Sequence, residues 1–102
     1  MNNLNDILTS LDIVKLVGQS DINLTGVNSD SRKVEAGNMF VATRGTQVDG
    51  HDYIQSAIEK GAVAIVCEIL PKTLSLDVAY VVVQNANVAL GKIASAWYDF
   101  PS

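Results

Sequence analysis

The fold of this chain is decided by residues 39–67, which read MFVATRGTQVDGHDYIQSAIEKGAVAIVC. The stretch opens with a short apolar run, Met39–Ala42, and closes with a longer one, Ala62–Cys67. The second run is continuous and contains β-branched residues, a pattern typical of a strand covered on both faces. We therefore expect two buried strands, joined by a segment long enough to contain a helix.

A helix is predicted between these two runs. Asp52 is a suitable N-cap, and Gln55 lies three residues later, which is the spacing of a capping box. Gly61 follows and can adopt the left-handed conformation that ends many helices. An apolar stripe lies between them at helical spacing and consists of Ile54, Ala57 and Ile58.

The rest of the chain continues this alternation of helices and strands. Leucine and isoleucine at helical spacing predict a short helix within residues 4–11, and residues 22–27 alternate like a strand. Ala79–Val83 is another buried strand, after which Asn85 or Asn87 caps a last helix that carries Trp97 on its apolar face. We predict a small α/β domain in which helices flank a mixed or mostly parallel sheet.

Composition limits the possible functions. A chain of 102 residues suits one domain, and a net charge of −4 argues against a surface for duplex nucleic acid. It does not exclude a phosphorylated small molecule, which needs only local donors. No signal peptide or membrane-length apolar run is present, so we expect a cytoplasmic protein with no membrane partner. The single cysteine, Cys67, is expected to be a buried reduced thiol.

Polar side chains gather on both sides of the Met39–Ala42 run. Ser29-Asp30-Ser31-Arg32 precedes it, and Arg44–Gly50 follows it. Hydroxyls, an amide, a cation and glycine N–H groups on loops can hold a small polar ligand. In an extended segment Ser29 and Ser31 would face one side and Asp30 the other. The alternative is a turn in which these side chains bond their own backbone.

The sequence shows no catalytic constellation. It contains no G-x-x-x-x-G-K-[ST] phosphate loop, and Gly91-Lys92 lies inside a predicted helix. His51 is the only histidine and has no partner at zinc-ligand spacing, so it is expected to be a polar residue in the first turn of a helix. We expect no metal site, and we expect this segment to bind rather than to catalyse.

Four short motifs in this order resemble one known family. They are Asp30-Ser31-Arg32, Gly37–Ala42, Gly45–Gly50 and Ala57–Ala62. Together they are similar to the N-terminal domain of the Mur ligases of bacterial cell-wall synthesis. Gln47 before Asp49-Gly50 favours the member that adds the third amino acid, diaminopimelate or lysine. The sister ligase that adds D-alanyl-D-alanine shares much of the pattern.

The resemblance implies a binding site for the uridine diphosphate part of the substrate. Many relatives carry histidine where this chain has Thr46, so a contact there would come from the backbone. Asp30, Arg32 and Asp49 are expected to support the site. The residues implied to contact the ligand are Ser29, Ser31, Thr46, Gln47 and Val48.

The same resemblance implies the activity of a longer enzyme. Its substrate would be UDP-N-acetylmuramoyl-L-alanyl-D-glutamate, and it would use ATP and Mg²⁺ to form an amide bond. Residues 1–102 are expected to be a single N-terminal domain that is inactive alone, without the central ATP-binding and C-terminal domains. The rival interpretation is a non-catalytic α/β interaction module.

Overall fold

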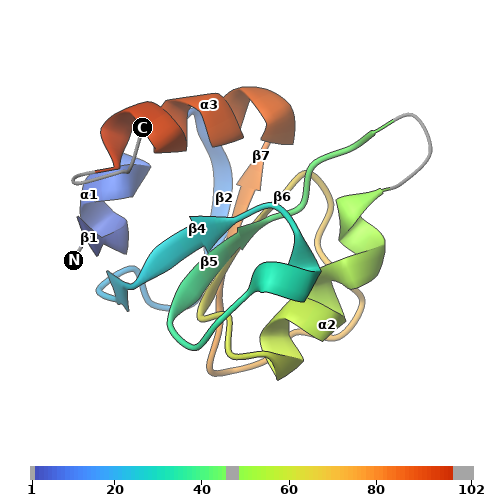
Figure 1. The fold of residues 1–102 in the computed structure, drawn as a ribbon. Helices are drawn as coiled ribbons and strands as arrows, with labels where there is room; N and C mark the ends of the chain where they lie inside the picture. Colours follow the sequence, from blue (N-terminus) through green and yellow to red (C-terminus); the bar gives the residue numbers. More distant parts are fainter. Residues whose placement is uncertain (1, 46–48, 98–102) are drawn as a thin grey trace.

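The computed structural model of the chain describes residues 2–45 and 49–97. Its largest sheet consists of β2 (Ile13–Val17), β4 (Gly26–Asn28), β5 (Asn38–Val41), β6 (Ala64–Cys67) and β7 (Ala79–Val83). These five strands lie in the order β2-β7-β6-β5-β4 (Figure 1). The last four are parallel to one another, and β2 pairs antiparallel with β7. The predicted α/β fold with a mixed, mostly parallel sheet is confirmed.

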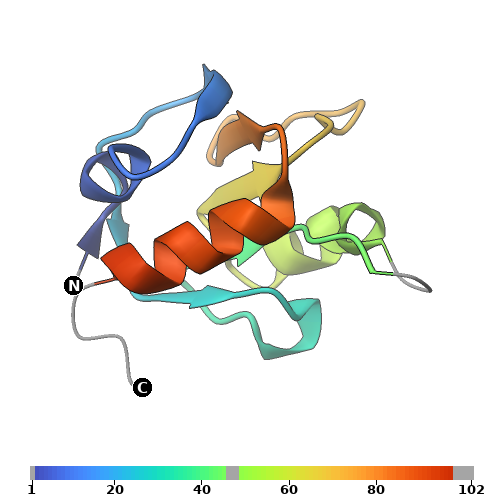
Figure 2. The same ribbon diagram turned by 90° about the horizontal axis from the view of Figure 1, so that it is seen from above.

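Helices cover both faces of this sheet. Helices α1 (Leu4–Leu8) and α3 (Ala86–Ala96) lie on one face, and α2 (Ile54–Glu59) lies on the other (Figures 1 and 2). A second, two-stranded sheet pairs β1 (Asn2–Asn3) with β3 (Asn23–Leu24) beside α1. None of the helices in residues 2–45 and 49–97 has the length and hydropathy needed to cross a membrane.

The core follows directly from the two-residue repeat of a strand. In β5, Met39 and Val41 pack with the residues of α1 and α3, whereas Phe40 packs with those of α2. Strands β6 and β7 alternate in the same way, and every residue of β5, β6 and β7 is buried. Because both faces of these strands are covered, their sequences are continuous apolar runs.

The predicted capping box before α2 is wrong. The N-terminal cap is Asp49, whose side chain accepts a hydrogen bond from the His51 N–H at 3.0 Å. A 3₁₀ turn over Gly50–Tyr53 comes first, and α2 starts at Ile54 without a side-chain cap. The predicted end is confirmed, because Gly61 has a φ of +110°.

Three further elements, α3, β2 and α1, refine the expected organisation. The amide oxygen of Asn85 accepts from the Val88 N–H at 3.1 Å, so Asn85 rather than Asn87 caps α3. Strand β2 was not predicted from the sequence pattern, although it forms one edge of the main sheet. The expected N-terminal helix ends at Leu8, and Leu11 is buried beyond it.

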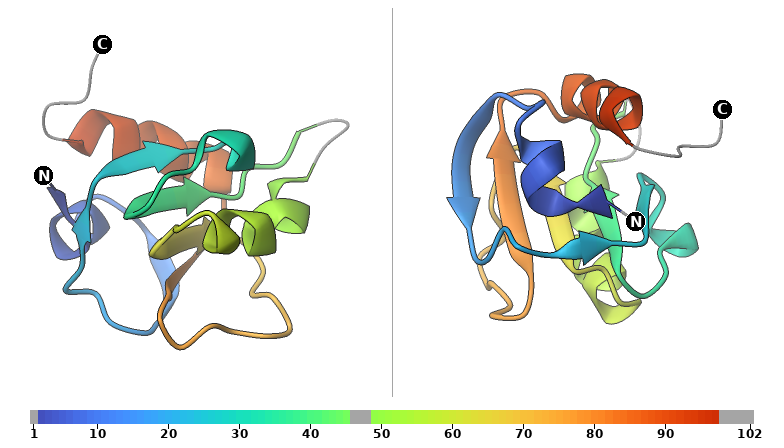
Figure 3. Two further views of the ribbon diagram at one scale, coloured as in Figure 1. Left: turned by 60° about the horizontal axis from the view of Figure 1, so that its bottom comes forward. Right: turned by 90° about the vertical axis from the view of Figure 1, so that its left-hand side faces the viewer.

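The four parallel strands run in the same direction, so the segments that follow them gather where these strands end (Figure 3). We call this boundary the carboxyl edge of the sheet. Ser29 follows β4, Ala42 follows β5, Glu68 follows β6 and Gln84 follows β7. Ligands of open parallel sheets bind at this carboxyl edge. The polar segments singled out in the sequence therefore lie at the position in the fold where a ligand is expected.

Candidate functional site

The first wall of the site follows β4 and is built around Asp30. Its carboxylate accepts the Arg32 N–H at 2.9 Å and caps a 3₁₀ turn over Ser31–Lys33. The Arg32 guanidinium donates to both oxygens of the same carboxylate, at 3.1 and 2.9 Å. These two side-chain bonds, helped by the backbone N–H, lower the pKa of Asp30 to about 2. Arg32 therefore supports Asp30 through two parallel hydrogen bonds that hold the guanidinium in one orientation. We call this pair the Asp30–Arg32 fork.

The second wall follows β5 and consists of the two described stems of a loop, residues 43–45 and 49–50, which contact each other. The Gly50 N–H donates to the Thr43 carbonyl at 2.7 Å, and Arg44 pairs with Asp49 at 3.5 Å. A side chain at Gly50 would lie 2.7 Å from that carbonyl oxygen, so only glycine fits. Three residues implied to contact the ligand lie outside the described part of the chain: Thr46, Gln47 and Val48.

A cavity of about 540 Å³ lies between these two walls. Its volume is within the range typical of small-molecule sites. Four residues singled out in the sequence come together here, namely Ser29, Asp30, Ser31 and Arg32. The expected outward orientation of Asp30 is wrong, because the chain leaves the extended conformation and turns at Ser31. The other lining residues are Phe40, Thr43, Gly45, Gly50 and Tyr53.

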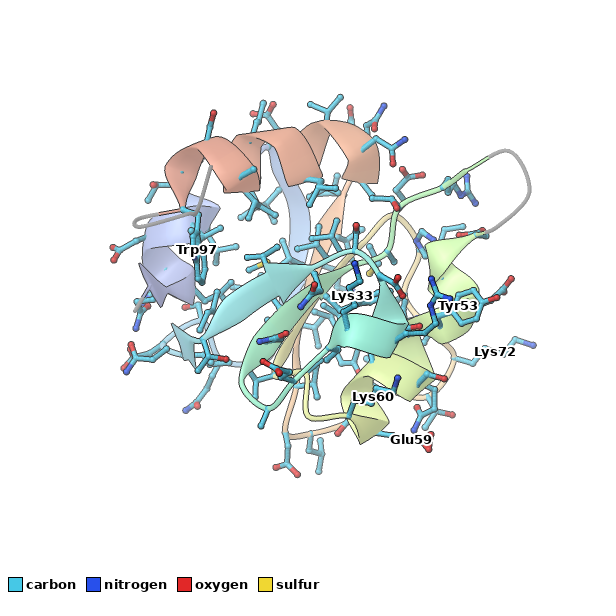
Figure 4. All side chains as sticks on the ribbon, viewed as in Figure 1. Lys33, Tyr53, Glu59, Lys60, Lys72 and Trp97 are labelled. Carbon is cyan, nitrogen blue, oxygen red and sulfur yellow. The ribbon has the colours of Figure 1, made fainter. Side chains whose placement is uncertain are left out.

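Two aromatic rings contribute to the cavity and were not assigned to the site from the sequence. Phe40 is 1% exposed and therefore serves the core and the cavity at once. Tyr53 is 43% exposed, so its ring is accessible at the side of the cavity. Figure 4 shows Tyr53 at the site and Trp97 on the opposite side of the molecule, beside α1. Trp97 packs against the core cluster, as the sequence predicted.

Asp49 does not line the cavity. Its carboxylate faces His51, accepting the His51 backbone N–H at 3.0 Å and bonding the imidazole Nδ1 at 2.7 Å. These two bonds, in that order, lower the pKa of Asp49. Asp49 therefore supports the loop from behind, as far as the described residues show.

A buried amide fixes the end of β4, and sequence reasoning did not find it. Asn38 is 3% exposed, and its side-chain oxygen accepts from the Asn28 amide at 2.7 Å and the Glu35 N–H at 3.0 Å. Its own amide donates to Thr25 Oγ1 at 3.1 Å. Asn28 and Thr25 are distant from Asn38 in the sequence and lie near it only in the fold. The amide thus sets the position of Asn28, which immediately precedes Ser29.

The arrangement can hold a polar ring and an anionic group. Two serine hydroxyls, one guanidinium and the backbone groups of the second wall offer hydrogen bonds, as do the hydroxyls of Thr43 and Tyr53, and the two aromatic rings offer apolar contact. Burial raises the pKa of the Cys67 thiol to about 11, so it stays protonated at neutral pH and is a poor nucleophile. Within residues 2–45 and 49–97, no three carboxylate, imidazole or thiol groups are placed to share a metal ion.

Comparison with known proteins gives a consistent family. Residues 23–98 match the model of the Mur ligase family, catalytic domain. The chain is 52% identical, over 97% of its length, to a UDP-N-acetylmuramoyl-L-alanyl-D-glutamate–2,6-diaminopimelate ligase of Bacteroides fragilis. It is 43% identical, over the same share, to the ligase of that name from Cytophaga hutchinsonii. The chain spans about a fifth of the length of these relatives.

Solved structures agree with this assignment. The Acinetobacter baumannii ligase that is named for adding D-alanyl-D-alanine superposes with a TM-score of 0.75 at 20% identity. That match covers 92% of this chain and 21% of the other, and it shows the fold alone. The MurF ligase of Thermotoga maritima, solved with ADP, gives a TM-score of 0.61 at 32% identity over 74% of this chain and 17% of its own. The chain described here therefore belongs to the Mur ligase family.

Proposed function

We propose that this chain is the uridine-diphosphate-binding domain of a bacterial ligase. That ligase would add diaminopimelate to UDP-N-acetylmuramoyl-L-alanyl-D-glutamate during cell-wall synthesis in the cytoplasm. One observation carries the proposal. The cavity at the carboxyl edge of the sheet is lined by Ser29 and Ser31, to which the family resemblance assigns the uridine nucleotide, and by Gly45 and Gly50. The high identity to relatives named as diaminopimelate ligases supports the choice of amino acid.

The residues of the cavity have complementary roles in this proposal. Ser29 and Ser31 supply hydroxyls, and Arg32 supplies a cation for a phosphate, held in place by Asp30. Uracil presents one N–H donor between two carbonyl acceptors, an edge that loop backbone groups and one amide can match. Thr46, Gln47 and Val48 are proposed to provide that edge. Tyr53 would cover a face of the base.

The role of this domain in the reaction is positional. Uridine is remote from the carboxylate that reacts, and binding energy from a remote group can hold the reacting group in place. The sequence has no phosphate loop, and the residues that the structure describes gather no metal ligands. We assign ATP and Mg²⁺ to central and C-terminal domains of a longer protein, consistent with relatives that are about five times longer.

Two alternative functions have less support than this one. The first is the ligase that adds D-alanyl-D-alanine, but the MurF structure from Thermotoga maritima is 32% identical over 74% of this chain, against 52% over 97% for the diaminopimelate relative. A non-catalytic interaction module is the other. It would have no need for a cavity lined by two serines, an arginine and a tyrosine.

A calorimetric titration of this chain tests the proposal. UDP should bind weakly, because only one end of the full substrate is present and the loss of translational freedom must still be offset. UDP should bind at least about tenfold more tightly than ADP, a difference of about 1.4 kcal/mol. Gln47→Ala should weaken UDP binding without lowering the unfolding temperature. Equal affinity for UDP and ADP would contradict a uridine site.

A further inference from the structure

His51 lies behind the second wall of the cavity and joins segments that are distant in sequence. Its Nδ1 is 2.7 Å from Asp49 Oδ1, at the end of the loop. Its Nε2 accepts the backbone N–H groups of Glu68 at 2.9 Å and Ile69 at 3.3 Å, just beyond β6. The ring is nearly enclosed, with 12% of the side chain exposed. His51 is not among the residues that line the cavity.

The hydrogen-bond partners define the tautomer of the ring. Two backbone N–H groups point at Nε2, so that nitrogen must present its lone pair rather than a proton. The ring proton is therefore on Nδ1 and is donated to the carboxylate of Asp49. This arrangement requires a donor and an acceptor on opposite sides of one rigid ring. Among the standard side chains only neutral histidine provides both at this spacing.

Arg44 completes the connection from the other stem of the loop. Its guanidinium lies 3.5 Å from Asp49 Oδ2 and 3.5 Å from Glu68 Oε1. The other oxygen of Glu68 accepts the Ala86 N–H at 2.8 Å, at the first residue of α3. Both stems of the loop are thus tied to the end of β6, and through Glu68 to α3.

We infer that His51 is a positioning residue for nucleotide binding, acting through Asp49 on the loop that forms the second wall. The inference rests on the proposed function and adds to it a residue that has no contact with the ligand site. Gly45 and Gly50, next to the two tied stems, both line the cavity. Releasing the stems would let that wall occupy many positions, and each productive binding event would then have to order it.

Three substitutions separate the two halves of the connection. His51→Asn keeps a donor for Asp49 but has no acceptor that reaches Glu68. His51→Gln keeps an acceptor for Glu68 but has no donor at the position of Nδ1. His51→Ala removes both. Each amide variant should weaken UDP binding by roughly 2- to 12-fold, the effect of one lost hydrogen bond, and the alanine variant should weaken it further.

Asn3→Ala is the matched control, because Asn3 caps α1 on the far side of the sheet from the loop. It should lower the unfolding temperature by an amount similar to the histidine variants and leave the UDP affinity unchanged. Amide hydrogen exchange at Gly45 and Gly50 should accelerate in the histidine variants but not in Asn3→Ala. This second measurement needs no ligand.

The outcomes separate the inference from the function on which it rests. If the unaltered chain fails to bind UDP, the proposed function fails and the role of His51 falls with it. If the unaltered chain binds UDP and all three histidine variants bind it equally well, only the inference is overturned. Unfolding of all three variants would make His51 a purely structural residue and would also overturn it.

Discussion

Ser29 and Ser31 are the two serines that the fold brings to one cavity. Neither side chain has a hydrogen bond to another described residue, and both line the space next to the Asp30–Arg32 fork. The sequence offered two conformations for this segment, an extended one and a turn closed by its own side chains. The turn is present, and the Asp30 carboxylate closes it rather than either serine. The hydroxyls are therefore available to a ligand as far as the described residues are concerned.

Ser31→Ala should weaken UDP binding by roughly 2- to 12-fold, because one neutral hydrogen bond is lost. The free energy of unfolding should change little, since no described residue depends on that hydroxyl. Titration calorimetry and urea unfolding measure the two effects. Ser56→Ala, at an exposed position of α2, is the control and should alter neither. Unchanged UDP affinity in Ser31→Ala would place the ligand elsewhere.

The Asp30 carboxyl should titrate near pH 2 in the folded chain, below its usual value of 3.8. Because the pKa of Asp30 is lower in the folded chain, its ionised carboxylate stabilises the fold at pH values above 3.8. This stabilisation is lost as the pH falls through about 2. Arg32→Ala should raise the pKa of Asp30 toward 3.8, since the side-chain bond from Arg32 is the main cause. Carbon-detected NMR titration measures both values. An ordinary pKa in the unaltered chain would show that the fork does not persist in solution.

At the scale of elements, the buried strands were predictable and the edge strand was not. Strands β5, β6 and β7 are covered on both faces, so burial leaves a continuous apolar run in each sequence. Strand β2 pairs with β7 alone, and its central residues are exposed, Val14 to 59%. Because neither face of β2 is consistently buried, its sequence carries no clear strand period.

The site was predictable where local sequence determines it. Ser29 follows the segment predicted as a strand leading to Val27, and Gly45 lies just after the apolar run Met39–Ala42, so the place of both at a strand end follows from the pattern. Partners that the fold brings together left no local signal, as for Asn38 with Asn28, and for His51 with the backbone after β6. The N-cap was misplaced because Asp49 and Asp52 are both suitable residues. The 3₁₀ turn that decides between them depends on contacts with Thr43.

Two glycines at or within helices should respond in opposite ways to alanine, because their surroundings differ. A side chain at Gly61 would lie 2.7 Å from the Ala36 Cα, and the residue has a φ of +110°. Gly61→Ala should therefore lower the free energy of unfolding by roughly 1–3 kcal/mol. Gly91 lies inside α3 with nothing within 4 Å, so Gly91→Ala should raise it by about 0.5–1 kcal/mol. Urea unfolding measures the free energy of unfolding of both variants. Changes of the same sign in the two would contradict the described backbone.

At the scale of the whole molecule, the two faces of the sheet have different roles. The helices α1 and α3 bury most of one face in a core that has no part in the cavity. The other core contributes Phe40 to the cavity, and the Tyr53 ring lies just before α2. The domain is thus a rigid support with its ligand groups on the segments that follow its strands.

This chain alone should form no amide bond and hydrolyse no ATP. Its sequence holds no phosphate loop, and no metal-ligand cluster is found in residues 2–45 and 49–97. The assay would supply UDP-N-acetylmuramoyl-L-alanyl-D-glutamate, diaminopimelate, ATP and Mg²⁺, and would follow phosphate release. Turnover that persists through rigorous purification, and that Ser31→Ala reduces, would show that catalysis resides in this domain.

NMR mapping of UDP onto the ¹⁵N-labelled chain tests the central claim most directly. The backbone amides of Ser29–Arg32, Gly45, Gly50 and Tyr53 should shift in a saturable way, because these residues line the cavity between the two walls. Amides of α1 and of Trp97, on the opposite side of the molecule, should stay unchanged, and ATP at the same concentration should produce smaller shifts. Shifts that fall outside the two walls, or that UDP and ATP produce equally, would contradict a uridine-nucleotide site at the carboxyl edge of this sheet.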